Sequence, residues 1–144
     1  MYGVEDESLL TPLNRELLNR ARETPSPVFV AASLRLQLAA RTIVRFWADY
    51  DVVVTPTLAL KPVPIGWILD DEEARSSLGL PLTPFTAIAN VTGQPALSVP
   101  LAWDGGLPIG IHLIGPPEGD GLLLRLGAQL EEARPWAGRR PPHS

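Results

Sequence analysis

The sequence predicts an α/β fold in which three or four strands are covered by helices. Three observations support this class. Apolar residues at helical spacing alternate along the 144-residue chain with short apolar runs that are typical of strands. The 16 prolines stand between these segments rather than in one tract, so they mark the ends of elements. Apolar residues make up 45% of the chain, which is enough for a packed core.

Two helices are expected in the first third of the chain. The segment from Thr11 to Arg22 begins with a Thr-Pro pair, in which the threonine can act as the N-cap and the proline fits the first turn. A Ser-Pro pair at Ser26 repeats this signal and opens a longer helix that ends near Ala48. The apolar side chains of the longer helix share one face: Phe29, Ala32, Leu36, Ala39, Ile43 and Trp47.

Three strands are expected in the rest of the chain. The β-branched run Asp51–Thr55 indicates a strand that is buried on both faces. A two-glycine turn separates the runs Ala96–Trp103 and Ile109–Gly115, so we expect a β-hairpin over Ala96–Gly115. The residues from Leu58 to Leu82 contain several prolines and predict a long loop with about one helical turn.

Two further helices complete the pattern. Thr83 is expected to cap a short helix that runs through Asn90 and ends at Gly93. Asp120 is expected to cap the last helix. The apolar face of the last helix consists of Leu122, Leu123, Leu126, Leu130 and Ala133. Three strands provide few neighbours for a strand that is apolar on both faces, which indicates that further elements complete the sheet.

Composition argues against several classes of function. Without cysteine there is no disulfide framework, no thiolate nucleophile and no cysteine zinc site. The net charge is −4 and no basic stripe is present, so nucleic acid is not expected as a partner. No apolar run approaches the roughly 20 residues that cross a bilayer, and acidic residues at 5–7 stand where a signal peptide carries positive charge. We therefore expect a cytoplasmic protein with no membrane partner.

The residues by themselves point to no catalytic centre. No serine lies in a Gly-x-Ser-x-Gly elbow, and His112 is interpreted as a structural histidine of the second hairpin strand. The acidic run Asp70 to Glu73 lacks the alternating ligands and central glycine of a calcium loop, so it is interpreted as a solvated charge run. We expect no catalytic residue, no metal and no cofactor in this chain.

Four blocks of the chain nevertheless resemble the C-terminal part of the amidase signature family. In chain order they are Asp49–Thr57 (DYDVVVTPT), Thr83–Trp103 (TPFTAIANVTGQPALSVPLAW), Gly106–Gly115 (GLPIGIHLIG) and Leu122–Trp136. The resemblance implies the C-terminal part of an α/β/α fold around a mixed sheet. It makes residues 1–138 a partial amidase domain without its catalytic half and leaves residues 139–144 as a flexible Pro-rich tail. The second block resembles simple amidases and oligo-amide hydrolases more than the tRNA-linked amidotransferase subunit.

The family hydrolyses amides through a Ser–cis-Ser–Lys triad that lies upstream of the matched blocks. Lys61, the only lysine, matches no triad position, so the resemblance implies a chain that is inactive alone. The resemblance also implies that Thr83, Phe85, Thr86 and Asn90 line the cleft for a small-molecule amide in the complete enzyme, with Trp67 as a pocket or lid residue. The structural alternatives are a cap (Thr83), a packing residue (Phe85), a hydrogen bond to the turn 93–95 (Asn90) and a loop anchor (Trp67).

A second hypothesis is a non-catalytic domain that acts by association. A piece of a large sheet exposes strand edges and apolar helix faces, and both favour pairing with another chain. We therefore expect either a homo-oligomer or a partner that supplies the missing N-terminal half.

Overall fold

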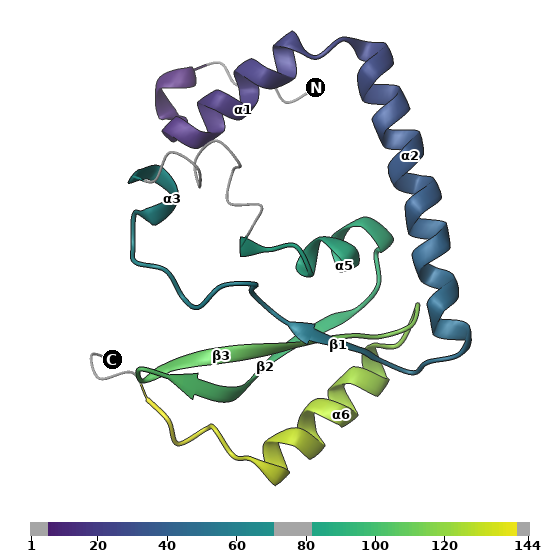
Figure 1. Ribbon diagram of the computed structural model, residues 1–144, viewed down its shortest axis with the longest axis vertical. Helices are drawn as coiled ribbons and strands as arrows, with labels where there is room; N and C mark the ends of the chain where they lie inside the picture. The colour runs from purple at the N-terminus through teal and green to yellow at the C-terminus, as the bar shows by residue number, and fades with distance from the viewer. Residues whose placement is uncertain (1–5, 71–81, 141–144) are drawn as a thin grey trace.

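The computed structural model describes residues 6–70 and 82–140 and has the expected α/β fold (Figure 1). The helices α1 and α2 come first, and a short strand, a loop, a short helix, a hairpin and a last helix follow. The elements are η1 (Glu7–Leu9), α1 (Pro12–Glu23), α2 (Ser26–Val44), η2 (Arg45–Ala48), β1 (Val53–Pro56), α3 (Trp67–Asp70), α5 (Thr86–Thr92), β2 (Ala96–Asp104), β3 (Leu107–Ile114) and α6 (Asp120–Ala133).

The described strands form one antiparallel sheet in the order β1-β3-β2, so the last strand of the chain lies in the middle. The predicted hairpin is confirmed: Asp104 faces Leu107 across a two-residue turn. Both turn residues, Gly105 and Gly106, have positive φ angles of 56° and 83°. A type I′ turn requires this conformation, which explains why two glycines occur there. The resemblance implies a mixed sheet, whereas the part described here is antiparallel throughout.

The core lies between the hairpin and α6, which packs against one face of the sheet (Figure 1). Val99 of β2, Leu113 of β3 and Leu123 of α6 are buried together. Gly127 faces the sheet so closely that a Cβ there would lie 2.7 Å from Leu97 Cδ2. A small residue at this position lets the helix approach β2. Of the apolar face predicted for α6, Leu123, Leu126 and Leu130 thus belong to the core, whereas Ala133 at its end is exposed.

Helix α2 is exposed along most of its length, although its sequence is strongly apolar. It contacts α5, and Trp47 Nε1 of the following turn η2 donates a hydrogen bond to the carbonyl of Ile114 at 3.3 Å. Of the stripe predicted on this helix, Ile43 and Trp47 are half-buried, whereas Phe29 remains 66% exposed. The described part of the chain therefore covers only the C-terminal end of this stripe.

The combined helix Ser26–Ala48 contains an 18-residue window with a mean hydropathy of 1.3 and is long and apolar enough to cross a membrane. By this measure, the expectation that no segment approaches the length of a membrane span is wrong. The test uses length and composition only, and helices from the cores of soluble proteins also pass it.

Three predicted helix caps are wrong by a few residues. Pro25 is the N-cap of α2, because its carbonyl accepts from the N–H of Val28 at 2.9 Å, and Ser26 is already helical. Gly119 precedes α6, so Asp120 lies in the first turn. Thr83 lies before the turn that leads into α5 and makes no cap bond. The predicted caps at Thr11 and Gly93 are confirmed.

The expectation that the first strand is buried on both faces is also wrong for this chain. β1 is an edge strand that pairs with β3 alone, and Val54 is 61% exposed. The apolar run is real, but the described residues cover only the face that carries Val53. Such a strand has one face and one edge open to further elements.

Candidate functional site

Four of the residues expected to line a cleft lie together at the start and along one side of α5. Thr83, Phe85 and Thr86 are half-buried, and Asn90 is exposed one turn further along the helix. The Thr86 hydroxyl donates to the carbonyl of Thr83 at 3.1 Å, which fixes the entry to the helix. Within the described residues the Asn90 side chain forms no hydrogen bond, so it does not hold the turn after the helix.

Trp67 lies on a different element. It is the first residue of α3, where it is half-buried and its backbone N–H donates to the carbonyl of Pro64 at 3.1 Å. A backbone hydrogen bond from Ala59 to the carbonyl of Leu82, at 3.1 Å, joins the loop after β1 to the entry of α5. Residues 71–81 between these elements, with most of the predicted acidic run, lie outside the described residues.

Gln94, which the sequence analysis did not single out, anchors the turn after α5. Its Nε2 donates to the carbonyl of Gly115 at 2.7 Å, and the N–H of Gly115 donates to the carbonyl of Pro95 at 2.9 Å. Gln94 is buried, and its Oε1 has no partner among the described residues. These bonds fix the C-terminal end of α5 to the end of β3, so the position of the helix follows from the sheet. The polar residue between Gly93 and Pro95 was the available signal.

A row of polar side chains crosses the sheet on the face opposite α6. Thr55 and Ser98 face His112 from either side in the strand register. The Thr55 hydroxyl lies 3.4 Å from His112 Nδ1, and the hydroxyls of Thr57 and Ser98 lie 2.6 Å apart. Alternating polar residues in three strands were the signal for this row, but only the register brings them together.

His112 lies beside one hydroxyl, that of Thr55 at 3.4 Å, and has the surroundings of a buried structural residue. The imidazole is 4% exposed, and burial lowers its pKa, so the ring is neutral near pH 7. Its one side-chain contact in the described structure is Thr55, and Ser98 pairs with Thr57 instead. This arrangement agrees with the structural role expected for His112.

Lys61 is likewise unsuited to acid–base chemistry. Its ammonium lies 2.7 Å from the Asp104 carboxylate at the hairpin turn, and both side chains are exposed. The hydrogen bond to Asp104 raises the pKa of Lys61, whereas a general base at neutral pH requires a lowered value. Across residues 6–70 and 82–140, no three His, Asp or Glu side chains gather into a possible metal site.

The sequence model of the family described as Amidase matches residues 4–124. Among curated proteins, the chain is 40% identical over 115 residues to a protein named putative amidase AmiC from Mycobacterium tuberculosis (strain H37Rv). This match covers 78% of the chain but only 24% of that protein. The chain therefore spans about a quarter of the length of such relatives.

A second relative has a solved counterpart. The 6-aminohexanoate-cyclic-dimer hydrolase of Paenarthrobacter ureafaciens is 35% identical over 136 residues, covering 88% of this chain and 28% of that protein. A solved structure of a 6-aminohexanoate cyclic dimer hydrolase superposes with a TM-score of 0.82 and 32% identity, over 95% of this chain and 30% of the other. With a family match over most of its length and a fold shared with such a hydrolase, this chain belongs to the amidase signature family.

Proposed function

We propose that this chain forms the C-terminal part of an amidase, in which the remaining part of the fold supplies the nucleophilic serine and the lysine. The observation that carries this proposal is the superposition on the cyclic dimer hydrolase, which uses nearly all of this chain and about a third of the enzyme. Neither His112 nor Lys61 has the environment of a catalytic group, which supports a centre built elsewhere.

In the complete enzyme the reaction is amide hydrolysis in two steps. A serine hydroxyl adds to the amide carbonyl, the C–N bond breaks, and the amine leaves with a proton. Water then attacks the acyl-enzyme ester and releases the carboxylate and the free serine. The role proposed for α5 is to border the cleft, with Asn90 as a hydrogen-bonding group toward the substrate and Phe85 as an apolar wall. The name of the second relative favours oligo-amides of amino acids as the substrate class.

A chimera tests the proposal. In the cyclic dimer hydrolase, the segment that aligns with this chain is replaced by residues 6–140, and hydrolysis of the cyclic dimer is measured. We expect a soluble chimera with activity above that of the truncated hydrolase without the segment. A chimera that melts cooperatively but hydrolyses no more substrate than the truncated protein would contradict the proposal.

Point variants of the same chimera test the role of α5. Asn90→Ala is expected to lower kcat/KM by about three- to tenfold, since one hydrogen bond is worth about 0.5–1.5 kcal/mol. Thr92→Val is the matched control on the same helix, because the Thr92 hydroxyl bonds to the carbonyl of Ile88. Equal effects of the two variants would remove the cleft role from Asn90. The chain alone should show no amide turnover and no serine labelling by a fluorophosphonate.

Association is a second candidate function, and the exposed face of α2 favours it. Large apolar side chains along this helix are open: Val28, Phe29, Val30, Leu34, Leu36 and Leu38. At the C-terminal end of this helix, a hollow of about 310 Å³ lies between α2, η2, β1 and α5 and includes Ile43, Trp47 and Val53 in its lining. Under this proposal the isolated chain forms a homo-oligomer through α2. Light scattering checks it, and a stable monomer with a cooperative melt would exclude it.

A further inference from the structure

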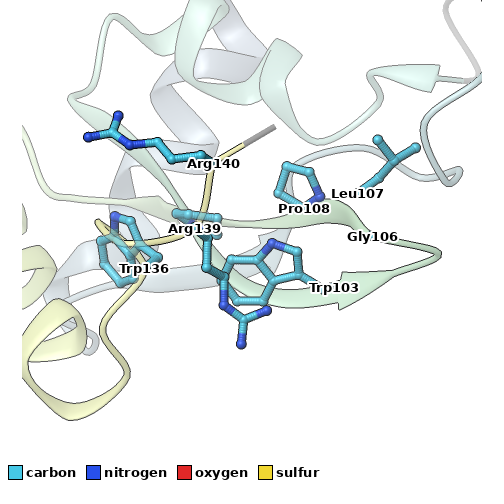
Figure 2. A pocket seen from close by; sticks show the side chains of 8 residues that line it. Trp103, Gly106, Leu107, Pro108, Trp136, Arg139 and Arg140 are labelled. Carbon is cyan, nitrogen blue, oxygen red and sulfur yellow. The ribbon is translucent and has the colours of Figure 1, made fainter. Parts of the chain in front are cut away.

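A pocket of about 600 Å³ lies where the hairpin turn meets the segment after α6 (Figure 2). This pocket is separate from α5 and from the polar row on the sheet. Its lining consists of Pro100, Trp103, Gly106, Leu107, Pro108, Trp136, Arg139 and Arg140. The hairpin contributes one side and the C-terminal segment the other, so the pocket joins residues that are about 30 positions apart in the sequence.

Two tryptophans and one arginine give the pocket its shape. The Arg139 guanidinium carbon lies 3.8 Å from the centroid of the Trp103 ring, which is a cation–π contact (Figure 2). The backbone N–H of Arg139 donates to the carbonyl of Trp136 at 2.9 Å, so a turn places this guanidinium over the hairpin. Trp136 is itself partly buried against the core, which fixes the other wall.

The charge of the pocket is positive in a chain whose net charge is −4. Arg139 and Arg140 both line it, and within the described residues neither forms an ion pair. The acidic residue of the hairpin turn, Asp104, already pairs with Lys61 at 2.7 Å. The pocket therefore combines aromatic and proline walls with two guanidinium groups that have no carboxylate partner among the described residues.

We propose that this pocket binds a small aromatic carboxylate. The ring would lie against Trp103, Trp136 and Pro108, where aromatic pairs gain from stacked or edge-to-face contact. The carboxylate would take the guanidinium group of Arg139, whose planar donors match its two oxygens, because the Arg140 side chain extends away from Arg139 (Figure 2). A neutral ring should bind more weakly because it cannot pair with the guanidinium, and a bare anion should not bind because it makes no contact with the apolar walls. This inference does not depend on the amidase proposal, since it uses none of the α5 residues.

Titration of the full chain with 2-naphthoate tests the site, with the indole N–H signals of the four tryptophans followed by NMR. Single Trp→Phe variants assign the signals. We expect the signals of Trp103 and Trp136 to shift and those of Trp47 and Trp67 to stay. The neutral analogue 2-naphthylmethanol should bind with lower affinity, and inorganic phosphate should shift none of the four signals.

Variants separate the pocket from general surface binding. Arg139→Gln is expected to weaken naphthoate binding by about two- to fivefold, as for an exposed charge pair, whereas Arg140→Gln should have a smaller effect because its side chain extends away from Arg139 (Figure 2). Arg35→Gln on α2 is the matched control and should leave the affinity unchanged. Equal shifts of Trp47 and Trp67, equal affinity for the neutral ring, or unchanged affinity in Arg139→Gln would each overturn the proposal. So would an acidic peptide that shifts Trp103 and Trp136 when naphthoate does not.

Discussion

The hairpin with α6 buries its apolar side chains, whereas α1 and α2 expose theirs. Val99, Leu113 and Leu123 form a closed cluster on one face of the sheet. In contrast, neither α1 nor α2 contains a buried residue, although α2 is 19 residues long and rich in leucine and valine. Helical propensity alone seldom keeps a helix stable in water, so most helices depend on a packed face. The difference shows that the C-terminal region has its own core, while α2 has a face suited to packing that the described residues leave open.

The largest effect is expected in the core of the C-terminal region. Leu123→Ala removes a side chain that is 3% exposed and should lower the free energy of unfolding by about 2–5 kcal/mol. Leu124→Ala is the matched control, because the next residue on the same helix is 68% exposed. Its effect should stay within about 0.5 kcal/mol. Urea titrations followed by circular dichroism measure both, and similar losses would mean that α6 is not anchored by this face.

A somewhat smaller effect is expected on the opposite face of the sheet. A Cβ at Gly110 would lie 2.5 Å from Thr57 Oγ1 and 2.7 Å from Ser98 Oγ. Gly110→Ala should therefore force the two hydroxyls apart and destabilise the chain by about 1–3 kcal/mol. Gly138→Ala, where a Cβ meets nothing within 4 Å, is the control and should leave the urea midpoint unchanged. An unchanged midpoint in Gly110→Ala as well would show that the polar row is loosely packed.

The same row predicts a pH dependence. Burial lowers the pKa of His112 in the folded state, so the unfolded chain binds a proton more readily there. Stability should be full above about pH 6.5, the ordinary value for histidine, and fall as the pH drops below it. His112→Gln should remove this fall, whereas His143→Gln should keep it. Chemical denaturation at several pH values checks both, and a fall that persists in His112→Gln would assign it to other groups.

The smallest effect on stability is expected on α2. Leu34→Gln and Leu38→Gln replace exposed leucines by another good helix former and should each change the free energy of unfolding by less than about 0.5 kcal/mol. If the isolated chain associates through this face of α2, the two substitutions should also lower the molecular mass that light scattering measures. A loss of stability close to that of Leu123→Ala would mean that the isolated chain buries α2, which would abolish the contrast between the two regions.

Local signals in the sequence predicted most of the elements. The two glycines of the hairpin turn, Thr11 as a cap and Gly93 as a helix end are all confirmed, because each depends on a few neighbouring residues. The predicted N-caps of α2 and α6 were each wrong by one residue. In a Pro-Ser-Pro or Gly-Asp sequence, the helix can begin at either of two adjacent residues. The expected burial of β1 was wrong because an apolar run indicates what a strand is suited to contact, and the described residues provide no partner for one of its faces.

The candidate sites depended more on distant contacts. The residues of α5 are neighbours in sequence, so their grouping was predictable, and their role in a cleft stays a prediction. The contact between Thr55 and His112 required the strand register, which no local pattern provides. The stacking of Arg139 on Trp103 joins the predicted tail to the hairpin, and neither residue alone indicates it. The burial of Gln94 could not be predicted, because a glutamine that becomes buried looks like any other turn residue in the sequence.

The central position of β3 has a consequence for synthesis on the ribosome. β1 pairs only with β3, and its Thr55 meets His112, a residue 57 positions later. At about 5–20 residues per second, β1 waits roughly 3–12 s for its partner strand to be made. The hairpin, in contrast, closes over a two-residue turn as soon as β3 emerges. We therefore expect nascent chains of this protein to depend most on chaperones in the interval between the two strands, when the apolar β1 and α2 are both uncovered.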